Sequence, residues 1–306
     1  MNTDIIKNYR SQNNLRHSFN ALAEKTFDGL SFEAWYQNGY WNDRYNPYSI
    51  VTDGEIIANV SVNTIDFIWN GERRHLIQLG TVMTEEHFRN QGLIRQIMNE
   101  IDREYAAAAD GFYLFANDSV VDFYPKFGFR KAIEYRYTKP FSTSKKCSMV
   151  QVPMRIADPD CLQDLPCSSN NRTDHRSRLV NAMRRSVSYS RLRMVDNDNL
   201  MMFYLTGFMQ ENVYYNQEYD AYVIAEIEDG ILTVYDVFCG YKYPLDDILS
   251  AFGSDIRQIV LGFTPSDAAG YNVCAFREED CTLFVKGRCF DHFEQDQVIF
   301  PVLSHA

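Results

Sequence analysis

The chain has 306 residues, of which 45% are hydrophobic and 23% charged, a composition typical of a folded protein long enough for two domains. Its net charge of −11 disfavours binding to nucleic acids or anionic membrane surfaces, because those partners attract basic proteins. We therefore expect no nucleic-acid partner and no membrane partner, whereas an acidic chain is compatible with a cationic substrate such as an amine.

The seven cysteines are odd in number, and no two of them are spaced as C-x-x-C. We expect free thiols and no metal site. The first residues lack the basic and apolar segments of a signal peptide, and no apolar run reaches the roughly 20 residues of a membrane-spanning helix. These features predict a cytoplasmic protein.

The first residues predict helices, and the chain then changes to strands. Residues 1–30 carry apolar residues at helical spacing, and residues 32–37 predict a second short helix. Six aromatic residues follow between positions 35 and 48, which either pack under a loop or form the wall of a substrate pocket. Turn signals at Asp53-Gly54 and Asn70-Gly71 predict two hairpins. The mostly apolar residues 76–82 predict a central strand.

The next segments predict a strong helix and a short buried strand. Residues 93–108 place their apolar side chains on one helical stripe, and residues 112–116 form the strand. Asn117 or Asp118 begins a further helix that Pro125 and Gly128 end. A last strand is expected at residues 129–138.

The second half predicts a reduced version of the same order of elements. A connector rich in proline precedes a helix at residues 174–187. Strands are expected at residues 221–239, 256–263, 281–285 and 297–303, with a helix at 243–252. The predicted fold is α/β, with a mixed central sheet flanked by helices and duplicated in tandem. The expected divisions are a catalytic domain at 1–140, a connector at 141–172 and a degenerate domain at 173–306.

The segment from residue 79 to residue 94 carries the chemical signal. The buried strand 79–84 leads through a short loop to Arg89-Asn90-Gln91-Gly92 and into the strong helix. The first amides of a helix lack internal partners and carry the positive end of its dipole, so this turn suits a diphosphate. Gly92 allows close approach of the backbone, and Arg89 adds positive charge.

This segment resembles the cofactor motif of the GNAT superfamily of acyl-CoA-dependent N-acetyltransferases, Q/R-x-x-G-x-G/A after a V-x-V/T strand. Val82-Met83-Thr84 matches the strand and Arg89–Gly92 matches the loop, whereas Ile94 departs from the usual small residue. A second motif follows, in which Asn117 and the stretch from Tyr124 to Phe129 resemble the family's N-x(6)-Y-x-K-x-G-F. The resemblance covers about residues 1–140, and the second half has no glycine loop.

The resemblance implies a site between two splayed parallel strands, 76–83 and 112–116. The pantetheine arm of acetyl-CoA would pair with Val82 and Thr84, and the amide of Val82 or Met83 would polarise the thioester carbonyl. The implied cofactor-binding residues are Val82, Met83, Thr84, Arg89, Asn90, Gln91, Gly92, Leu93, Ile94, Asn117 and Tyr124.

Two residues are the predicted catalytic groups. By its position in the family motif, Tyr124 would protonate the departing thiolate. The base that deprotonates the amine has several candidates, of which Asp66 is selected because it lies on a central strand facing the expected acceptor side. The other candidates are Glu85, Glu86, His87 and the C-terminal residues, where either the terminal carboxylate or His305 would act.

The predicted function is transfer of an acetyl group from acetyl-CoA, as co-substrate, to a primary amine of a small molecule or peptide. One alternative is a non-catalytic acyl-CoA-binding regulatory protein, and another is a structural interaction protein that binds no acetyl-CoA. The sequence does not identify the acceptor, the acyl chain length or the oligomeric state.

Overall fold

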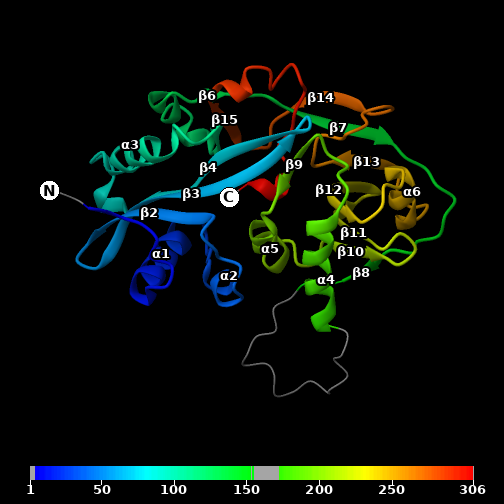
Figure 1. Cartoon of the computed structure of the whole chain (residues 1–306), viewed down its shortest axis with the longest axis horizontal. Helices are drawn as coiled ribbons and strands as arrows, with labels where there is room; N and C mark the ends of the chain where they lie inside the picture. Colours follow the sequence, from blue (N-terminus) through cyan, green and yellow to red (C-terminus); the bar gives the residue numbers. More distant parts are fainter. Residues whose placement is uncertain (1–3, 153, 155–171, 306) are drawn as a thin grey trace.

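The chain folds into two mixed β-sheets flanked by helices, as the α/β prediction requires (Figure 1). The structure is a computed structural model that describes residues 4–152, 154 and 172–305. Most of the predicted connector at 141–172 therefore lies outside the described residues.

The first sheet holds the predicted cofactor segment. Its order is β1-β2-β3-β4-β5-β15-β6, and β9 pairs with the end of β3. Among its described strands, β4 and β5 are the one parallel pair. Its strands are β1 (Ile5–Ile6), β2 (Tyr45–Thr52), β3 (Glu55–Trp69), β4 (Glu72–Thr84), β5 (Gly111–Ala116), β6 (Arg130–Lys131), β9 (Leu192–Val195) and β15 (Thr282–Lys286).

The second sheet repeats this pattern of directions. Its order is β14-β7-β13-β12-β11-β10-β8, and only β12 and β13 run parallel. Its strands are β7 (Glu134–Pro140), β8 (Val150–Gln151), β10 (Val213–Asn216), β11 (Ala221–Glu228), β12 (Ile231–Cys239), β13 (Gln258–Leu261) and β14 (Asn272–Phe276).

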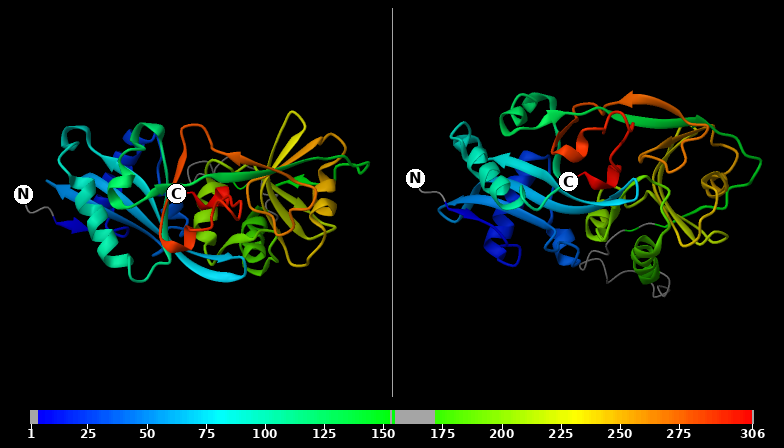
Figure 2. Two further views of the ribbon diagram at one scale, coloured as in Figure 1. Left: turned by 90° about the horizontal axis from the view of Figure 1, so that it is seen from above. Right: turned by 45° about the horizontal axis from the view of Figure 1, so that its top comes forward.

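The two halves of the chain exchange strands between the sheets, and β9 from the second half already pairs with β3 of the first sheet. β15, from the second half, lies between β5 and β6 of the first sheet, and β7 lies between β13 and β14 of the second. Figure 2 shows the chain around β7 crossing from one half to the other. Each sheet therefore depends on both halves of the chain, and the domain limits at residues 140 and 173 stay a prediction.

Helices cover both faces of the first sheet. Figure 1 shows α3 above its strands and α1 and α2 below them. Helix α3 follows the predicted apolar stripe, whereas the helix expected over residues 1–30 begins only at Asn13. The helices are α1 (Asn13–Thr26), α2 (Glu33–Gln37), α3 (Leu93–Tyr105), α4 (Arg172–Arg185), α5 (Asp198–Thr206) and α6 (Leu245–Leu249).

Both predicted hairpin turns are present. Asp53 and Gly54 join β2 to β3, and Asn70 and Gly71 join β3 to β4, all four with positive φ as such turns require. The predicted strand at 297–303 is absent, because that segment is irregular and ends in a short 3₁₀ turn. None of the described helices is long and apolar enough to cross a membrane.

Candidate active site

β4 and β5 separate along their length. They pair only at Leu76 with Gly111, Ile77 with Phe112, and Gln78 with Tyr113. Beyond that point β5 continues to pair with β15 on its other side, so the edge of β4 from residue 79 to residue 84 has no strand partner in β5. The predicted splay of the two strands is therefore present.

A β-bulge distorts β4 where the gap begins. The register shifts between Asn59 and Ser61, so that Val60 alone faces two residues of β4. Thr81, one of these two, has a φ of 47°. The Asn59 amide donates to the Thr81 carbonyl at 2.8 Å, and the hydroxyls of Tyr45 and Thr81 lie 2.6 Å apart. These buried contacts hold the bulge in place.

The register directs particular backbone groups into the gap. The N–H of Glu85 donates to the Ile57 carbonyl of β3, and successive residues of a strand point to alternate sides. The N–H and carbonyl of Met83 therefore face β3, whereas those of Val82 and Thr84 face the gap. Of the two amides predicted to polarise a thioester carbonyl, only that of Val82 is turned toward the gap.

The loop between β4 and α3 presents further unpaired amides. Asn90 and Gly92 have positive φ values of 62° and 78°, and Gly92 is the N-terminal cap of α3. Within the described residues, no acceptor pairs with the backbone N–H of Asn90, Gln91 or Gly92. The first amides of α3, beginning with Leu93, lack partners by helix geometry.

The side chains of this loop bond to other groups and not to those backbone amides. Arg89 donates to the Thr84 carbonyl at 3.3 Å, and Gln91 donates to the His87 carbonyl at 3.2 Å. Ile94, which departs from the motif, packs partly buried against the core between α3 and the sheet. The loop can therefore hold an anion by its backbone, with Arg89 beside it.

Tyr124 lies on the α3 face of the first sheet. Its ring packs 5.5 Å from that of Phe284 and 6.3 Å from that of Phe129, measured between centroids. Burial raises the pKa of Tyr124 to about 12, so the hydroxyl keeps its proton at neutral pH. Val82 and Ile94 belong to the same apolar cluster.

Asn117 is held by the loop before β15. Its amide donates to a carboxylate oxygen of Asp280 at 2.8 Å, and the backbone N–H of Asp118 donates to the other oxygen at 2.6 Å. The exchanged strand thus fixes the segment that leads to Tyr124. Asp280 gave no signal in the sequence, because its partner lies more than 160 residues away.

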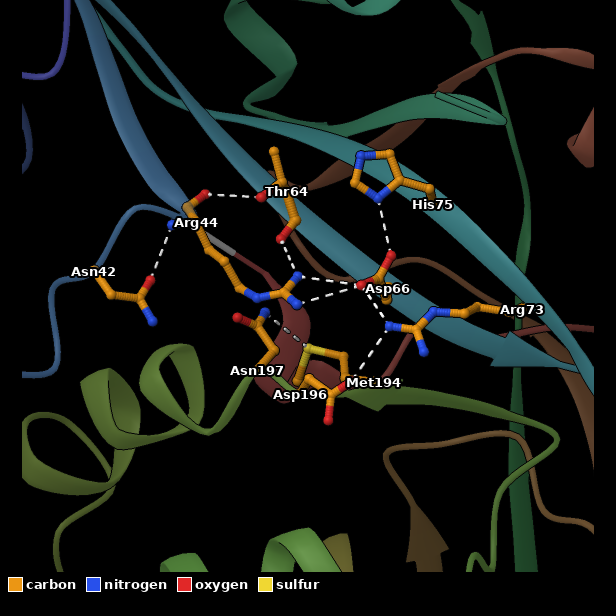
Figure 3. Close-up of polar contacts among 9 residues, drawn as sticks. All are labelled: Asn42, Arg44, Thr64, Asp66, Arg73, His75, Met194, Asp196 and Asn197. Carbon is orange, nitrogen blue, oxygen red and sulfur yellow. Dashed lines mark hydrogen bonds and ion pairs between the residues drawn. The ribbon is translucent and has the colours of Figure 1, made fainter. Parts of the chain in front are cut away.

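Asp66 is separated from the other predicted site residues. It pairs with His75, and Thr81 lies six residues further along β4, about 20 Å at roughly 3.3 Å per residue. Figure 3 shows its carboxylate between Arg44, Arg73 and His75, at 3.3, 2.9 and 2.9 Å. Burial alone would raise the pKa of Asp66, but these partners lower it to about 2. The catalytic role predicted for Asp66 stays a prediction, and this position does not favour it.

The other base candidates fall in two places. Glu85, Glu86 and His87 lie in the loop that precedes α3, and an ion pair with Lys25 lowers the pKa of Glu85. The C-terminal segment instead lies centrally between the two sheets (Figure 1).

Aromatic residues hold the C-terminal segment against β5. The Tyr113 hydroxyl donates to the Ser304 carbonyl at 2.9 Å, and the Tyr204 hydroxyl donates to the His305 carbonyl. The His305 ring stacks on Phe115. Its Nε2 is buried without a partner among the described residues, and burial lowers its pKa to about 3. His305 is therefore neutral at physiological pH, whereas Ala306 lies outside the described residues.

A cavity of about 260 Å³ opens on the side of β4 opposite α3. Thr81 and Tyr45 line it beside the bulge, and Trp35 lines it from α2, so part of the aromatic stretch does form a pocket wall. Trp41 and Tyr48 are buried in the core instead. Both interpretations of that stretch therefore hold in part.

Comparison with known proteins identifies the first half of the chain. Residues 10–132 match the family model for the acetyltransferase (GNAT) domain. Residues 10–132 therefore resemble a GNAT acetyltransferase domain. No curated protein matches the chain in sequence.

Solved structures extend the likeness of the GNAT domain to the whole fold. A probable N-acyltransferase from Enterococcus faecalis has a TM-score of 0.59 at 14% identity, covering 93% of this chain and 72% of that one. A GCN5-related N-acetyltransferase from Kribbella flavida has a TM-score of 0.53 at 13% identity, covering 92% and 71%. Eis1 from Mycobacterium abscessus has a TM-score of 0.53 at 14% identity, covering 92% and 73%. At these identities the likeness is one of fold.

Proposed function

We propose that this protein transfers an acetyl group from acetyl-CoA to a primary amine of a small molecule or peptide. The observation that carries this proposal is the gap between β4 and β5, bordered by backbone amides that no described strand satisfies. Such a gap suits an extended amide-containing arm, and the residues around it match the family model for the acetyltransferase (GNAT) domain.

The residues of the gap fit the parts of acetyl-CoA. The diphosphate would lie against the amides of Asn90, Gln91 and Gly92 at the positive end of α3, with Arg89 at the rim. The pantetheine amides would pair with the carbonyl of Val82 and the backbone of Thr84, which leaves the N–H of Val82 for the thioester oxygen. Asn117 would complete the site from the segment held by Asp280.

The second sheet does not offer an equivalent site. Its parallel pair, β12 and β13, is followed by Gly262, whose N–H donates to the Val234 carbonyl and whose carbonyl accepts from Val302. A methyl group added at Gly262 would meet Tyr235 at 3.1 Å and Val302 at 3.3 Å. This segment is therefore filled by protein, which supports a single acetyl-CoA per chain.

The reaction requires two proton transfers. The amine nitrogen forms a bond to the thioester carbonyl carbon, the carbonyl oxygen becomes negative, and the carbon–sulfur bond then breaks. The amide of Val82 would stabilise the oxyanion. The amine loses its proton to a base, and Tyr124, which is protonated at neutral pH, gives its proton to the thiolate.

We propose that the C-terminal segment orients the amine and that water takes its proton. An alkyl amine with a pKa of about 10 is mostly protonated at neutral pH and must lose a proton before it attacks. His305 is neutral, and its Nε2 lacks a partner among the described residues. It would accept a hydrogen bond from the amine and orient it.

The described cysteines are all free thiols, which supports the cytoplasmic location that we propose.

The test is thiol release from acetyl-CoA in the presence of simple alkyl and aryl amines, amino acids, polyamines and aminoglycosides, with the acetylated product identified by mass spectrometry. Amine-dependent release and an N-acetylated product are expected. Binding of acetyl-CoA without transfer to any amine would instead identify a regulatory acyl-CoA-binding protein. Absence of binding would identify a structural interaction protein.

A further inference from the structure

The cavity beside the β4 bulge is built by both halves of the chain. The first half contributes the segment between α1 and α2, then α2, β2 and β4, and the second half contributes α5 and the residues just after it. Its lining is Phe27, Leu30, Phe32, Trp35, Tyr45, Thr81, Leu200, Phe203, Tyr204 and Phe208.

This cavity adjoins the proposed reacting centre at two points. Thr81 precedes Val82, whose amide faces the gap that would hold the thioester. On the other side, the hydroxyl of Tyr204 donates to the carbonyl of His305 in the C-terminal segment. A molecule in the cavity would therefore lie between the thioester and the C-terminal segment, where the acceptor must be.

The polar side-chain atoms of the cavity lining already form hydrogen bonds within the protein. The indole N–H of Trp35 donates to the Asn199 carbonyl at 2.8 Å, and the hydroxyl of Tyr45 bonds with that of Thr81. None of the described side chains that line the cavity is charged. A polycationic or polyhydroxylated group would find no partner there, whereas an apolar group would meet ring faces.

The rings form a wall of the cavity, and one of them is exposed to solvent. Phe32 and Phe203 stack at 5.1 Å and 14°, and Trp35 meets Phe203 edge-on at 5.5 Å. Phe208, at the mouth, is 67% exposed although it is a large apolar side chain. The cavity therefore opens to solvent beside Phe208. An acceptor would enter by this opening, whereas an acyl chain would enter from the gap between β4 and β5.

We propose that this cavity holds an uncharged aromatic substituent of the amine acceptor, so that the protein prefers arylalkylamines. The proposal rests on the proposed acetyl transfer and specifies its acceptor. The cavity volume of 260 Å³ is several times the roughly 30 Å³ that one water molecule occupies in the liquid. The cavity is therefore large enough for a phenyl ring attached to the reacting amine. The reaction at the amine is the transfer already described.

The experiment compares phenethylamine with ethylamine, spermidine and kanamycin as acceptors, by kcat/KM from thiol release. Phe203→Ala enlarges the cavity, and Tyr241→Ala, which removes a 74% exposed aromatic side chain elsewhere in the second half, is the matched control. We expect phenethylamine to exceed ethylamine by about tenfold or more, and Phe203→Ala to remove most of that preference. The control is expected to keep it.

Binding gives a second measurement that does not depend on turnover. Calorimetry on the chain saturated with CoA is expected to show phenethylamine binding that Phe203→Ala weakens about tenfold and Tyr241→Ala leaves unchanged. Equal or faster turnover of spermidine or kanamycin, or an equal loss with all amines in Phe203→Ala, would overturn this inference alone. So would a preference for hexanoyl-CoA that Phe203→Ala abolishes, since the acyl chain would then occupy the cavity. If no amine is acetylated, the proposed function itself fails.

Discussion

The imidazole of His305 stacks on the ring of Phe115, with centroids 3.6 Å apart and planes at 27°. Phe115 lies on β5 after that strand has left β4, so the stack places His305 beside the strand that borders the gap. Two tyrosines, Tyr113 and Tyr204, bond to the backbone of the same segment. The C-terminal segment is therefore packed against the first sheet, and we propose that it forms part of the wall of the site.

His305→Phe separates packing from chemistry. The new ring keeps the stack on Phe115 but lacks the nitrogen that would orient the amine. We expect unchanged thermal stability and a fall in kcat of about tenfold or more. Because burial lowers the pKa of His305 to about 3, its titration is expected to be absent from the pH–rate profile near neutrality. Removing residues 304–306 should also lower kcat, and unchanged turnover in a stable truncated chain would exclude a catalytic role for the terminus.

Tyr124→Phe tests the proposed general acid. Only the hydroxyl is lost, and the ring keeps its contacts with Phe129 and Phe284. We expect normal folding and normal CoA affinity, with acetyl transfer slower by roughly 10²–10⁴. The rates are measured by thiol release at saturating acetyl-CoA. Near-normal turnover would mean that water or another group protonates the thiolate.

Asp66→Asn distinguishes an ion-pair role from a catalytic one. The carboxylate lies between Arg44, Arg73 and His75, and these partners lower its pKa to about 2. A lowered pKa adds stability above the ordinary value of 3.8, and this stability is lost as the pH falls through about 2. We expect the variant to unfold at lower temperature at neutral pH and to keep most of its turnover. Loss of turnover with unchanged stability would restore the catalytic role predicted from the sequence.

Glu134→Gln tests a pH dependence of stability. Glu134 is buried on β7, and its carboxyl accepts a hydrogen bond from the Phe300 N–H at 2.9 Å. Burial raises its pKa from 4.5 to about 8, so its contribution is full below pH 4.5 and is lost as the pH rises through about 8. The Tm advantage of the glutamine variant should grow between about pH 4.5 and pH 8 and then level off. A Tm difference that stays constant with pH would contradict this assignment.

Local sequence patterns predicted the helices, strands and turns better than they predicted which strands pair with one another. The turns at Asp53-Gly54 and Asn70-Gly71, the stripe of α3 and the strand–loop–helix around Gly92 are set by neighbouring residues, and all are present. The strand expected at 129–138 was assigned to the first half, yet the second half of that stretch, from Glu134, forms part of β7 in the second sheet. Strand pairing depends on contacts far apart in sequence, which no local period reports.

The same limit applies to the site. The amides of the cofactor loop follow from residues 79–94, whereas the cavity beside it needs α5 and the C-terminal segment. One signal was available in β3, where Asn59, Ser61 and Asn63 alternate with apolar residues and are all buried. Buried polar residues require partners, so this alternation indicates a polar network, here the one that holds Thr81.

The central claim is that one CoA binds to the backbone cradle at Gly92. The most direct measurement is titration calorimetry with CoA on the wild-type chain, Gly92→Val and Gly71→Val. Both glycines have positive φ, 78° and 88°, with nothing within 4 Å of an added Cβ, so the two substitutions strain the backbone alike. The account predicts one CoA per chain, with affinity weakened by about tenfold or more in Gly92→Val and preserved in Gly71→Val. Two CoA molecules per chain, or equal affinity in all three proteins, would contradict it.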